Sequence, residues 1–287
     1  MVSGIARWVL DETDLSRRSG ARSWVKAWAP PVPGIAEVFH ARIVEWAYPR
    51  HCHDTWAVLL VDEGAIRYDL EGRRHHAVPS SVTIIPPGAV HDGRPAPGSV
   101  GFRKRELYLD ATFLPQSLVG PAVDRTNLVD PGLASLLAGV HRSLTARELP
   151  LDTESRLALV GRRLLDQLDA HNSTTATTEV PEVKVAHRLR DLLDAQLTDP
   201  STLAAAAHRL HCSAGHLVRS FTREFGVSPH AYVIGRRIDI ARGRLLHGDR
   251  PGDVALDLGF YDQAHFTRHF RRHTSTTPAR FAAGGGR

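Results

Sequence analysis

Cysteine is almost absent from the sequence. The two cysteines, Cys52 and Cys212, lie 160 positions apart in a chain of 287 residues, in segments that we assign to different domains. Such a pair cannot build the disulfide framework of a small secreted domain, and free thiols are typical of a reducing compartment. We therefore expect two free thiols and a cytoplasmic protein.

Long apolar runs are absent as well. No stretch approaches the ~20 apolar residues that span a membrane, and the opening MVSGIARWVLDETDL mixes acidic residues into its apolar positions, unlike a secretory signal. The sequence also has no glycine-rich phosphate loop, no zinc-finger spacing of cysteine and histidine, and no local Ser/His/Asp set. A membrane protein and enzymes of these classes are therefore not indicated.

Lysine is scarce, and the basic residues, mostly arginine, are unevenly spread. Residues 182–287 hold 16 basic and 10 acidic residues, a net charge of +6, whereas residues 1–181 have a net charge of −1. This asymmetry favours a C-terminal part that binds a polyanion, although an ordinary solvated surface would have the same signature.

Short β-type runs fill the segment from about Val38 to Asp110. The runs are VFHARIVEW, TWAVLLV, AIRYDL, VTII and RELYLD, separated by turn signals such as DEG, EGRR and PPG. This spacing predicts a small barrel or sandwich. After Pro121 the period becomes helical: Asp130 can cap a helix that starts at Pro131, and a second amphipathic helix is expected from about residue 152 to 170.

The segment HNSTTATTEVPE, residues 171–182, is polar, has no apolar face and is typical of an interdomain linker. The hundred residues beyond it are helical by period. We therefore predict an α+β multidomain chain. It comprises a β-barrel domain in residues 1–120, two flanking helices in residues 121–170, the linker, and an all-α domain in residues 183–287.

An internal repeat lies in the all-α part. A shift of 49 positions aligns SAGHLVRSFTREFGVSPHAY, which starts at Ser213, with DQAHFTRHFRRHTSTTPARF, which starts at Asp262. The same supersecondary unit is therefore expected twice. The identical pairs include His216 with His265, Arg219 with Arg268, Phe221 with Phe270, and Pro229 with Pro278.

Each copy has the pattern of a helix-turn-helix unit. Ser213 and Asp262 are good N-caps, the fifth and ninth residues of each copy are apolar, and the opposite helical face is basic. A short helix, LAAAAHRL or DVALDL, precedes each capped helix, and a turn of three or four residues separates the two helices. The alternative is a plain helical bundle whose histidines and arginines are only packed or solvated.

From about residue 187 to 281 the chain resembles the tandem helix-turn-helix domain of the AraC/XylS family of bacterial regulators. The stretch VALDLGFYDQAHFTRHFRRHTSTTPARF is similar to that family's C-terminal signature over nearly its whole length. Ser275 departs from the pattern, because the family usually has glycine at this turn. Gly215 and Val218 also depart, at positions where members often carry base-reading side chains.

The resemblance implies two classes of contact with double-stranded promoter DNA. Arginine suits guanine and glutamine suits adenine, so base edges are assigned to four side chains, Arg219, Gln263, His265 and Arg268. Phosphates are assigned to three arginines, Arg223, Arg271 and Arg272.

From about residue 35 to 115 the chain is more loosely similar to the cupin-like effector-binding domain of the same family. In metal-dependent cupins the positions of His51, His53 and His91 carry ligands, but the usual glutamate is replaced here by Ala57 or Val58. We therefore expect no metal or other cofactor. If a metal were bound, these three histidines would be its ligands. A pocket for a small-molecule effector is assigned to His51, His53, His91, Arg67 and Tyr68.

Three smaller expectations concern neighbouring side chains. The Cys52 side chain should point away from the two flanking histidines, because successive strand residues alternate. His75 and His76 are interpreted as an exposed turn. Trp46 and Trp56 are assigned to the core by default.

These observations predict a sequence-specific transcription regulator, not an enzyme, whose promoter binding responds to an effector in the barrel. RNA polymerase would be a partner if the protein is an activator. A homodimer is expected through residues 152–170, with Leu157, Val160, Leu164 and Leu168 as its seam, unless these residues only cover the barrel. The alternatives are a metal-dependent cupin enzyme and an effector-independent DNA-binding protein whose barrel dimerises.

Overall fold

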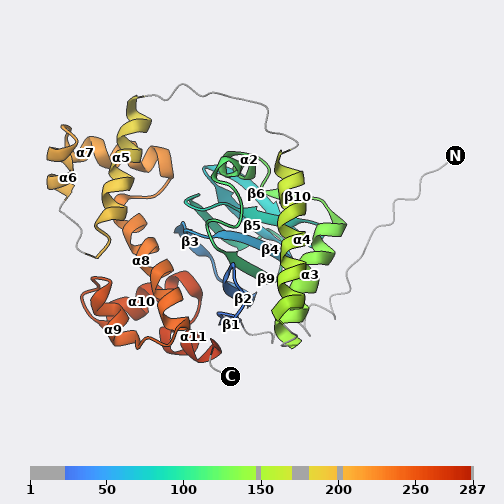
Figure 1. The fold of residues 1–287 in the computed structure, drawn as a ribbon. Coiled ribbons are helices and arrows are strands. Elements are labelled where there is room, and N and C mark those ends of the chain that lie inside the picture. Colours follow the sequence, from blue (N-terminus) through green and yellow to red (C-terminus); the bar gives the residue numbers. More distant parts are fainter. Residues whose placement is uncertain (1–22, 147–149, 170–180, 199–202, 286–287) are drawn as a thin grey trace.

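The computed structural model describes residues 23–146, 150–169, 181–198 and 203–285 (Figure 1). Within them, β-strands form the N-terminal part and helices form the C-terminal part, as the sequence predicts. The strands are β1 (Trp24–Trp28), β2 (Ile35–Ile43), β3 (Tyr48–His51), β4 (Trp56–Gly64), β5 (Ile66–Leu70), β6 (Arg73–Ala77), β7 (Val82–Ile85), β8 (His91–Pro95), β9 (Phe102–Leu109) and β10 (Asn127–Leu128).

The same described residues also form helices. They are η1 (Gln116–Leu118), α2 (Val119–Asp124), α3 (Pro131–Ala146), α4 (Pro150–Asp169), α5 (Pro181–Ala195), α6 (Leu203–Arg209), α7 (Ala214–Phe225), α8 (Pro229–Leu246), α9 (Pro251–Asp257), α10 (Gln263–Thr274) and α11 (Pro278–Gly285). No helix of the described residues is long and apolar enough to cross a membrane.

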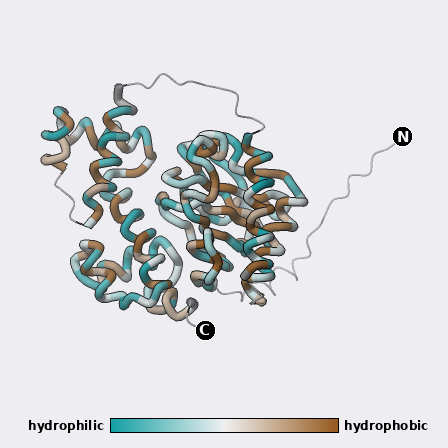
Figure 2. The backbone as a smooth tube through the Cα atoms, viewed as in Figure 1, coloured by the Kyte–Doolittle hydropathy of each residue, from teal (hydrophilic) through white to brown (hydrophobic). Residues whose placement is uncertain are grey.

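The strands form an open barrel of two antiparallel sheets. One sheet has six strands in the order β1-β2-β9-β4-β7-β10, and the other has four in the order β3-β8-β5-β6. Alternation along the large sheet separates its two faces: Phe39 belongs to the cluster inside the barrel, whereas its neighbour Val38 belongs to the cluster under the helices. Figure 2 shows the resulting concentration of hydrophobic residues within the sheets.

Helices α3 and α4 cover the outer face of the large sheet (Figure 1). Asp130 caps α3 as predicted, because its carboxylate accepts a hydrogen bond from the backbone N–H of Leu133 at 3.0 Å. Of the two roles expected for the apolar stripe on α4, a dimer seam or a cover for the barrel, the structure shows the second. The side chains of the stripe are at most 4% exposed and pack against the barrel: Leu157, Val160, Leu164 and Leu168.

The C-terminal domain repeats one arrangement, α6 with α7 and α9 with α10. The Ser213 hydroxyl accepts from the N–H of His216 at 3.2 Å, and the Asp262 carboxylate accepts from the N–H of His265 at 2.6 Å. Both predicted N-caps are therefore confirmed. Helix α8 joins the two units and lies beside the barrel, against β3 (Figure 1).

Three expectations about the barrel differ from the structure. His75 and His76 lie on strand β6 rather than in a turn, and the His75 ring stacks on Tyr68 with centroids 5.3 Å apart. Strand β10 pairs with β7, so the barrel continues past residue 120. Strand β1 was not predicted, because its sequence WVKAW is too short for a clear period of two.

The turn after α10 places a serine where glycine is favoured. Ser275 has φ 62° and ψ 7°, the left-handed conformation that closes the helix, and its hydroxyl is buried with no hydrogen-bond partner among the described residues. A Cβ atom in this region costs roughly 1–2 kcal/mol, partly offset by the greater freedom of glycine in the unfolded chain. Ser275, where the family usually has glycine, is therefore a site of local backbone strain.

We expect Ser275→Gly to raise the free energy of unfolding by about 1 kcal/mol, because it removes both the left-handed strain and the unpaired hydroxyl. The measurement is urea unfolding followed by circular dichroism. Ser275→Ala is the matched control, since it removes the hydroxyl and keeps the strain. If the glycine and alanine variants were equally stable, the backbone at position 275 would not be strained.

Candidate functional sites

The first recognition helix, α7, presents a basic outer face. Arg219 and Arg223 are exposed, whereas Leu217, Phe221 and Phe225 are buried beneath them. Gly215 is also exposed and leaves the neighbouring surface without a side chain. Arg219 is therefore the first fully exposed long side chain of this helix.

The second recognition helix, α10, exposes more predicted contacts than α7. Gln263 and Arg268 are exposed near its N-terminus and middle, and Arg271 and Arg272 are exposed in its last turn. His265 differs, because it is half-buried against Phe260, with ring centroids 5.6 Å apart. Its imidazole is therefore less available than the three arginines.

Sequence reasoning missed Tyr261, which directly precedes the N-cap of α10. Its side chain is 90% exposed. A large aromatic side chain that stays in solvent beside a basic helix suits contact with a nucleic acid. The signal was available in the sequence, since Tyr261 occupies a turn position where a small polar residue is common.

The barrel reaches the exposed face of α10 that carries Gln263 and Arg268. Trp46, from the loop between β2 and β3, lines an open groove of about 670 Å³ together with α10 side chains. Trp46 is half-buried beside this groove rather than fully in the core as expected, whereas Trp56 is completely buried. The α10 and following residues that line the groove are Gln263, Ala264, Thr267, Arg268, Arg271, Arg272 and Thr277.

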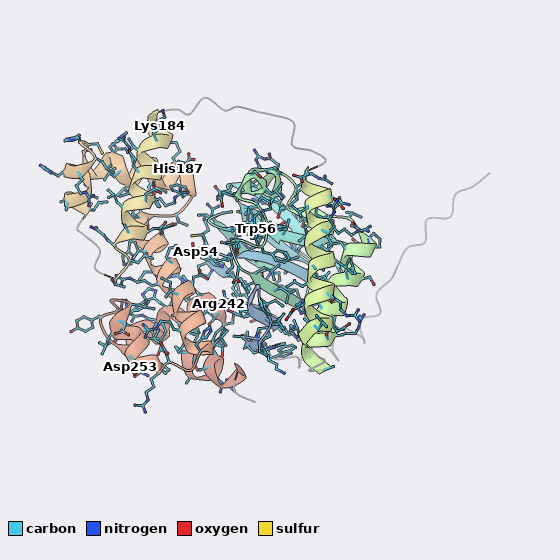
Figure 3. The ribbon with its side chains drawn as sticks, viewed as in Figure 1. Asp54, Trp56, Lys184, His187, Arg242 and Asp253 are labelled. Atoms are coloured by element: carbon cyan, nitrogen blue, oxygen red, sulfur yellow. The ribbon has the colours of Figure 1, made fainter. Side chains whose placement is uncertain are left out.

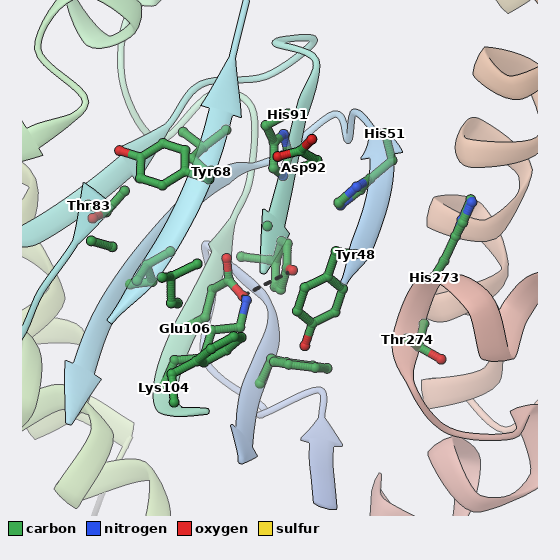
Figure 4. A pocket seen from close by; sticks show the side chains of 18 of the residues that line it. Tyr48, His51, Tyr68, Thr83, His91, Asp92, Lys104, Glu106, His273 and Thr274 are labelled. Atoms are coloured by element: carbon green, nitrogen blue, oxygen red, sulfur yellow. Dashed lines mark hydrogen bonds and ion pairs between the residues drawn. The ribbon is translucent and has the colours of Figure 1, made fainter. Parts of the chain in front are cut away.

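A small, partly open cavity lies between the two sheets of the barrel (Figure 4). Its volume is about 40 Å³, enough for a few water molecules. Apolar side chains from both sheets form much of its wall, including Phe39, Leu59, Ile66, Ile85 and Phe102. Polar side chains enter from β3, β8 and β9, namely Tyr48, His51, His91, Asp92, Lys104 and Glu106.

The DNA-binding half of the chain completes the cavity wall. Arg242 of α8 lines it, and so do His273 and Thr274 of α10, which lie opposite the strands (Figure 4). The cavity is therefore shared between the barrel and the helical domain.

The predicted pocket residues are only partly brought together. His51 and His91 are cross-strand partners on β3 and β8, with ring centroids 4.3 Å apart, and both line the cavity, as does Tyr68. The His53 ring lies behind them, 4.9 Å from His91. Arg67 does not belong to the lining, because alternation along β5 turns Tyr68 inward and Arg67 outward.

Burial keeps the three histidines neutral. Loss of solvent is the main cause that lowers the pKa of His51, His53 and His91, and neighbouring imidazoles add to it for His51 and His53. In the described part of the chain, no group of three or more His, Cys, Asp or Glu side chains is placed to hold a metal ion.

Two buried ion pairs that the sequence did not reveal lie at the cavity wall or directly behind it. Lys104 and Glu106 are 2.6 Å apart on β9. Arg242 of α8 lies 2.7 Å from Glu37 of β2, and its guanidinium is 4.3 Å from the Tyr108 ring centroid. Burial raises the pKa of Glu37 to about 7, against the opposing effect of Arg242.

Further contacts hold the helical domain on the barrel. The Arg236 guanidinium of α8, itself 6% exposed, lies 2.5 Å from the Asp54 carboxylate of the loop after β3. Arg50 of β3 donates to the backbone carbonyl of Gly226, at the end of α7, at 3.1 Å. Figure 3 shows Asp54 and Arg242 where the helical domain meets the strands.

Cys52 belongs to this contact rather than to the cavity. It is 2% exposed and packs in a cluster with residues of α5 and α7, including Leu189 and Phe221. Burial raises the pKa of its thiol to about 12, so the thiol is unreactive. The expected opposite orientation of Cys52 and the histidines agrees with these contacts.

Two domain families match the chain. The family described as an AraC-like ligand binding domain matches residues 34–160, and the family described as a helix-turn-helix domain matches residues 206–284. The uncharacterized HTH-type transcriptional regulator YbfI of Bacillus subtilis is 24% identical over 241 residues, which cover 80% of this chain and 85% of that protein. The regulator RipA of Corynebacterium diphtheriae is 31% identical over 104 residues, which cover 36% of this chain and 31% of RipA.

Solved structures of ToxT from Vibrio cholerae share the fold across both halves of the chain. The apo K231A variant has a TM-score of 0.58 at 12% identity and covers 92% of this chain and 98% of its own. ToxT bound to an unsaturated fatty acid has a TM-score of 0.54 at 13% identity, with 92% and 96% covered.

Proposed function

Since the chain belongs to the AraC family of transcription regulators, with an effector-binding domain and a helix-turn-helix DNA-binding domain, we propose that α7 and α10 together read its promoter. Helix α8, which separates them, has 18 residues and spans ~27 Å at ~1.5 Å per residue. That length suits two helices that enter successive major grooves, ~34 Å apart.

One observation carries the proposed link between effector and DNA: Arg242, His273 and Thr274 of the helical domain line the barrel cavity. A ligand in this cavity contacts both domains, so its binding energy depends on how they dock. The fatty acid in the ToxT structure supports a small organic effector in this architecture. The effector therefore acts by changing the contact between barrel and helices.

The groove beside Trp46 supports a docked arrangement that restricts DNA access. A recognition helix fills the major groove, and the sugar-phosphate walls must then occupy the space on both of its flanks. Trp46 occupies one flank of α10 and shares a groove with Gln263 and Arg268. The barrel must move away from α10 before a duplex can dock fully.

Binding to a fluorescent duplex of the protein's own upstream region tests this function. The duplex is titrated at several salt concentrations and against random competitor DNA. Tight binding that resists the competitor supports sequence-specific regulation. Equal affinity for the upstream and random duplexes would contradict it.

We expect Arg268→Ala and Arg272→Ala to affect DNA binding in different ways. Arg268 faces the base edges, so its loss should weaken specific binding by ~1–3 kcal/mol and relax the preference at one base position. Arg272 lies in the last turn of α10 and serves a phosphate, so its loss should weaken all sequences evenly and reduce the salt dependence by about one charge. Competition titrations with single-base variants of the duplex measure both. Equal losses on specific and random DNA for both variants would contradict the division.

The other partners follow from the same proposal. The protein acts in the cytoplasm, contacts RNA polymerase if it activates transcription, and has no catalytic role. A homodimer through residues 152–170 would use the outer face of α4, where Leu159 is 56% exposed, because the inner stripe is occupied by the barrel. Sedimentation measures that oligomeric state.

A further inference from the structure

The sequence RHCHD, residues 50–54, carries several of the contacts between the barrel and the helical domain. It ends β3 and begins the loop that follows. Within the barrel, the Arg50 guanidinium lies 3.4 Å from the Asp69 carboxylate and 3.8 Å from that of Asp92. Across the interface it donates to the Gly226 carbonyl at the end of α7, where a cation is favourable. We call residues 50–54 the docking strip.

The middle of the docking strip packs closely against the helices. Helix α8 can approach β3 because Gly235 has no side chain: a Cβ atom added there would lie 3.4 Å from Cβ of His51. Cys52 packs in the cluster that includes Leu189 of α5 and Phe221 of α7, and it is 2% exposed. The Cys52 thiol is therefore covered by the helical domain.

Asp54, at the end of the docking strip, is bound by α8 through both its side chain and its backbone. The Arg236 guanidinium lies 2.5 Å from its carboxylate, and the Asp239 carboxylate accepts from its N–H at 3.2 Å. The Asp54 side chain is 63% exposed, whereas that of Arg236 is 7% exposed. Arg236 has a second partner inside the helical domain, Asp194 of α5, at 3.1 Å.

These contacts can be broken at small cost. If the domains separate, the Asp54 carboxylate returns to water and Arg236 keeps Asp194, so neither charge is left unpaired in apolar surroundings. Arg50 likewise keeps its two carboxylates in the barrel. An ion pair with one partner largely in water contributes little net free energy, because water replaces the lost partner. The docking strip therefore suits a contact that opens and closes.

We propose that the docking strip holds the barrel against α10 in the closed protein and is released when the protein binds its promoter. The inference rests on the proposed function, in which the barrel leaves α10 before a duplex docks, and it names the contact that controls this step. The docking strip and DNA then compete for the helical domain. Weaker docking should strengthen DNA binding, and DNA should expose the docking strip.

Cys52 reports whether the docking strip is released. Burial raises the pKa of its thiol to about 12 in the closed protein, whereas an exposed thiol has a pKa near 8.5 and reacts much faster. The rate at which a maleimide labels Cys52 in the full-length protein is followed by peptide mass spectrometry, which distinguishes it from Cys212. We expect saturation with the upstream duplex to raise this rate at least about fivefold.

Asp54→Asn tests the docking strip without DNA. The variant removes the charge that faces Arg236 across the interface and leaves Asp194 in place, so the protein should fold and open more often. We expect Cys52 to be labelled about fivefold faster and the upstream duplex to bind about fivefold more tightly.

Asp124→Asn is the matched control for Asp54→Asn. It removes the same charge from an exposed carboxylate whose partner, Arg73, belongs to the barrel as well. Its labelling rate and DNA affinity should match those of the unaltered protein. Equal labelling rates in Asp54→Asn and Asp124→Asn would overturn the proposal.

A second pair of variants opens the domains without a change of charge. Leucine favours a helix more than glycine does, but the side chain introduced by Gly235→Leu would occupy the space of His51. Gly235→Ala is the control, because its Cβ atom lies at an ordinary contact distance. We expect faster labelling of Cys52 in Gly235→Leu and an unchanged rate in Gly235→Ala. Unchanged labelling in both variants would count against the close packing of α8 on the docking strip.

The outcomes separate this inference from the proposed function. If the upstream duplex binds tightly against competitor DNA but leaves Cys52 protected, release of the docking strip is wrong and sequence-specific regulation stands. If Asp54→Asn is labelled faster but the upstream and random duplexes bind equally, the docking strip is supported and the proposed function is contradicted.

Discussion

A change from pH 7 to pH 5.5 is expected to lower the free energy of unfolding by on the order of 4 kcal/mol. Buried imidazoles that are neutral in the folded protein take up protons on unfolding, where the usual pKa is about 6.5, and each contributes about 1 kcal/mol over this range. Solvent loss is the main cause that lowers the pKa in the six most buried histidines, His40, His51, His53, His91, His141 and His273.

The sign follows from the direction of these shifts. A base whose pKa is lowered by folding stabilises the native state above its unfolded pKa, and that contribution is lost as the pH falls below about 6.5. Two carboxyl groups act in the opposite direction, because burial raises the pKa of Glu37 to about 7 and of Asp239 to about 6. Protonation of these two at lower pH offsets about 2 kcal/mol of the loss.

Urea unfolding at pH 7.5, 6.5 and 5.5 measures the effect. His91→Gln should reduce the slope of stability against pH by up to one proton, about 1.4 kcal/mol per pH unit, while His76→Gln, exposed on β6, should leave the slope unchanged. Constant stability between pH 7.5 and 5.5 would show that the histidines are not neutral and buried as the structure places them.

Replacement of Arg242 by Met is expected to cost about 3 kcal/mol at pH 7.5, because it leaves the Glu37 carboxyl without a cation in apolar surroundings. The side chains of Arg242 and Glu37 are 9% and 7% exposed, so water cannot solvate the unpaired carboxylate. The guanidinium also loses its position 4.3 Å from the Tyr108 ring. Glu37 can escape the penalty only by protonation, so the loss should shrink toward pH 5.5.

A double-mutant cycle separates the ion pair from packing. Glu37→Gln in the Arg242→Met background should recover much of the loss, since no buried charge then remains. Arg244→Met is the matched control on the same helix, because the side chains of its partners Asp249 and Asp257 are 40% and 58% exposed, and it should cost no more than about 1 kcal/mol. A loss at Arg242 that Glu37→Gln does not reduce would assign it to packing.

The sequence predicts the local and repeated parts of this molecule. The caps at Ser213 and Asp262, the start of α3 at Pro131 and the two basic helices depend on residues a few positions apart, which periodicity and spacing can reveal. His51 and His91 could be grouped because both flank predicted strands. The phase of alternation on β5 could not be known, so Arg67 was assigned together with Tyr68 although the two point to opposite faces.

The shared part of the cavity could not be predicted. Arg242 and Glu37 are separated by 205 positions, and Arg236 and Asp54 by 182. An arginine in a helix is ordinarily a solvated residue, and no local pattern marks one that will be buried against another domain. Likewise, the stripe on α4 has the same sequence pattern whether it packs on the barrel or on a second subunit.

The shared cavity wall makes the coupling between DNA and effector reciprocal. On the proposed function, a ligand in the cavity, which Tyr48 of the barrel and Arg242 of α8 both line, binds best to one arrangement of the two domains, and DNA on α10 selects an arrangement too. By thermodynamic linkage, the factor by which effector changes the affinity for a promoter equals the factor by which that promoter changes the affinity for effector. Promoters of different strength would therefore set different effector thresholds, so one protein with one cavity could switch its target genes in a graded order as the signal rises.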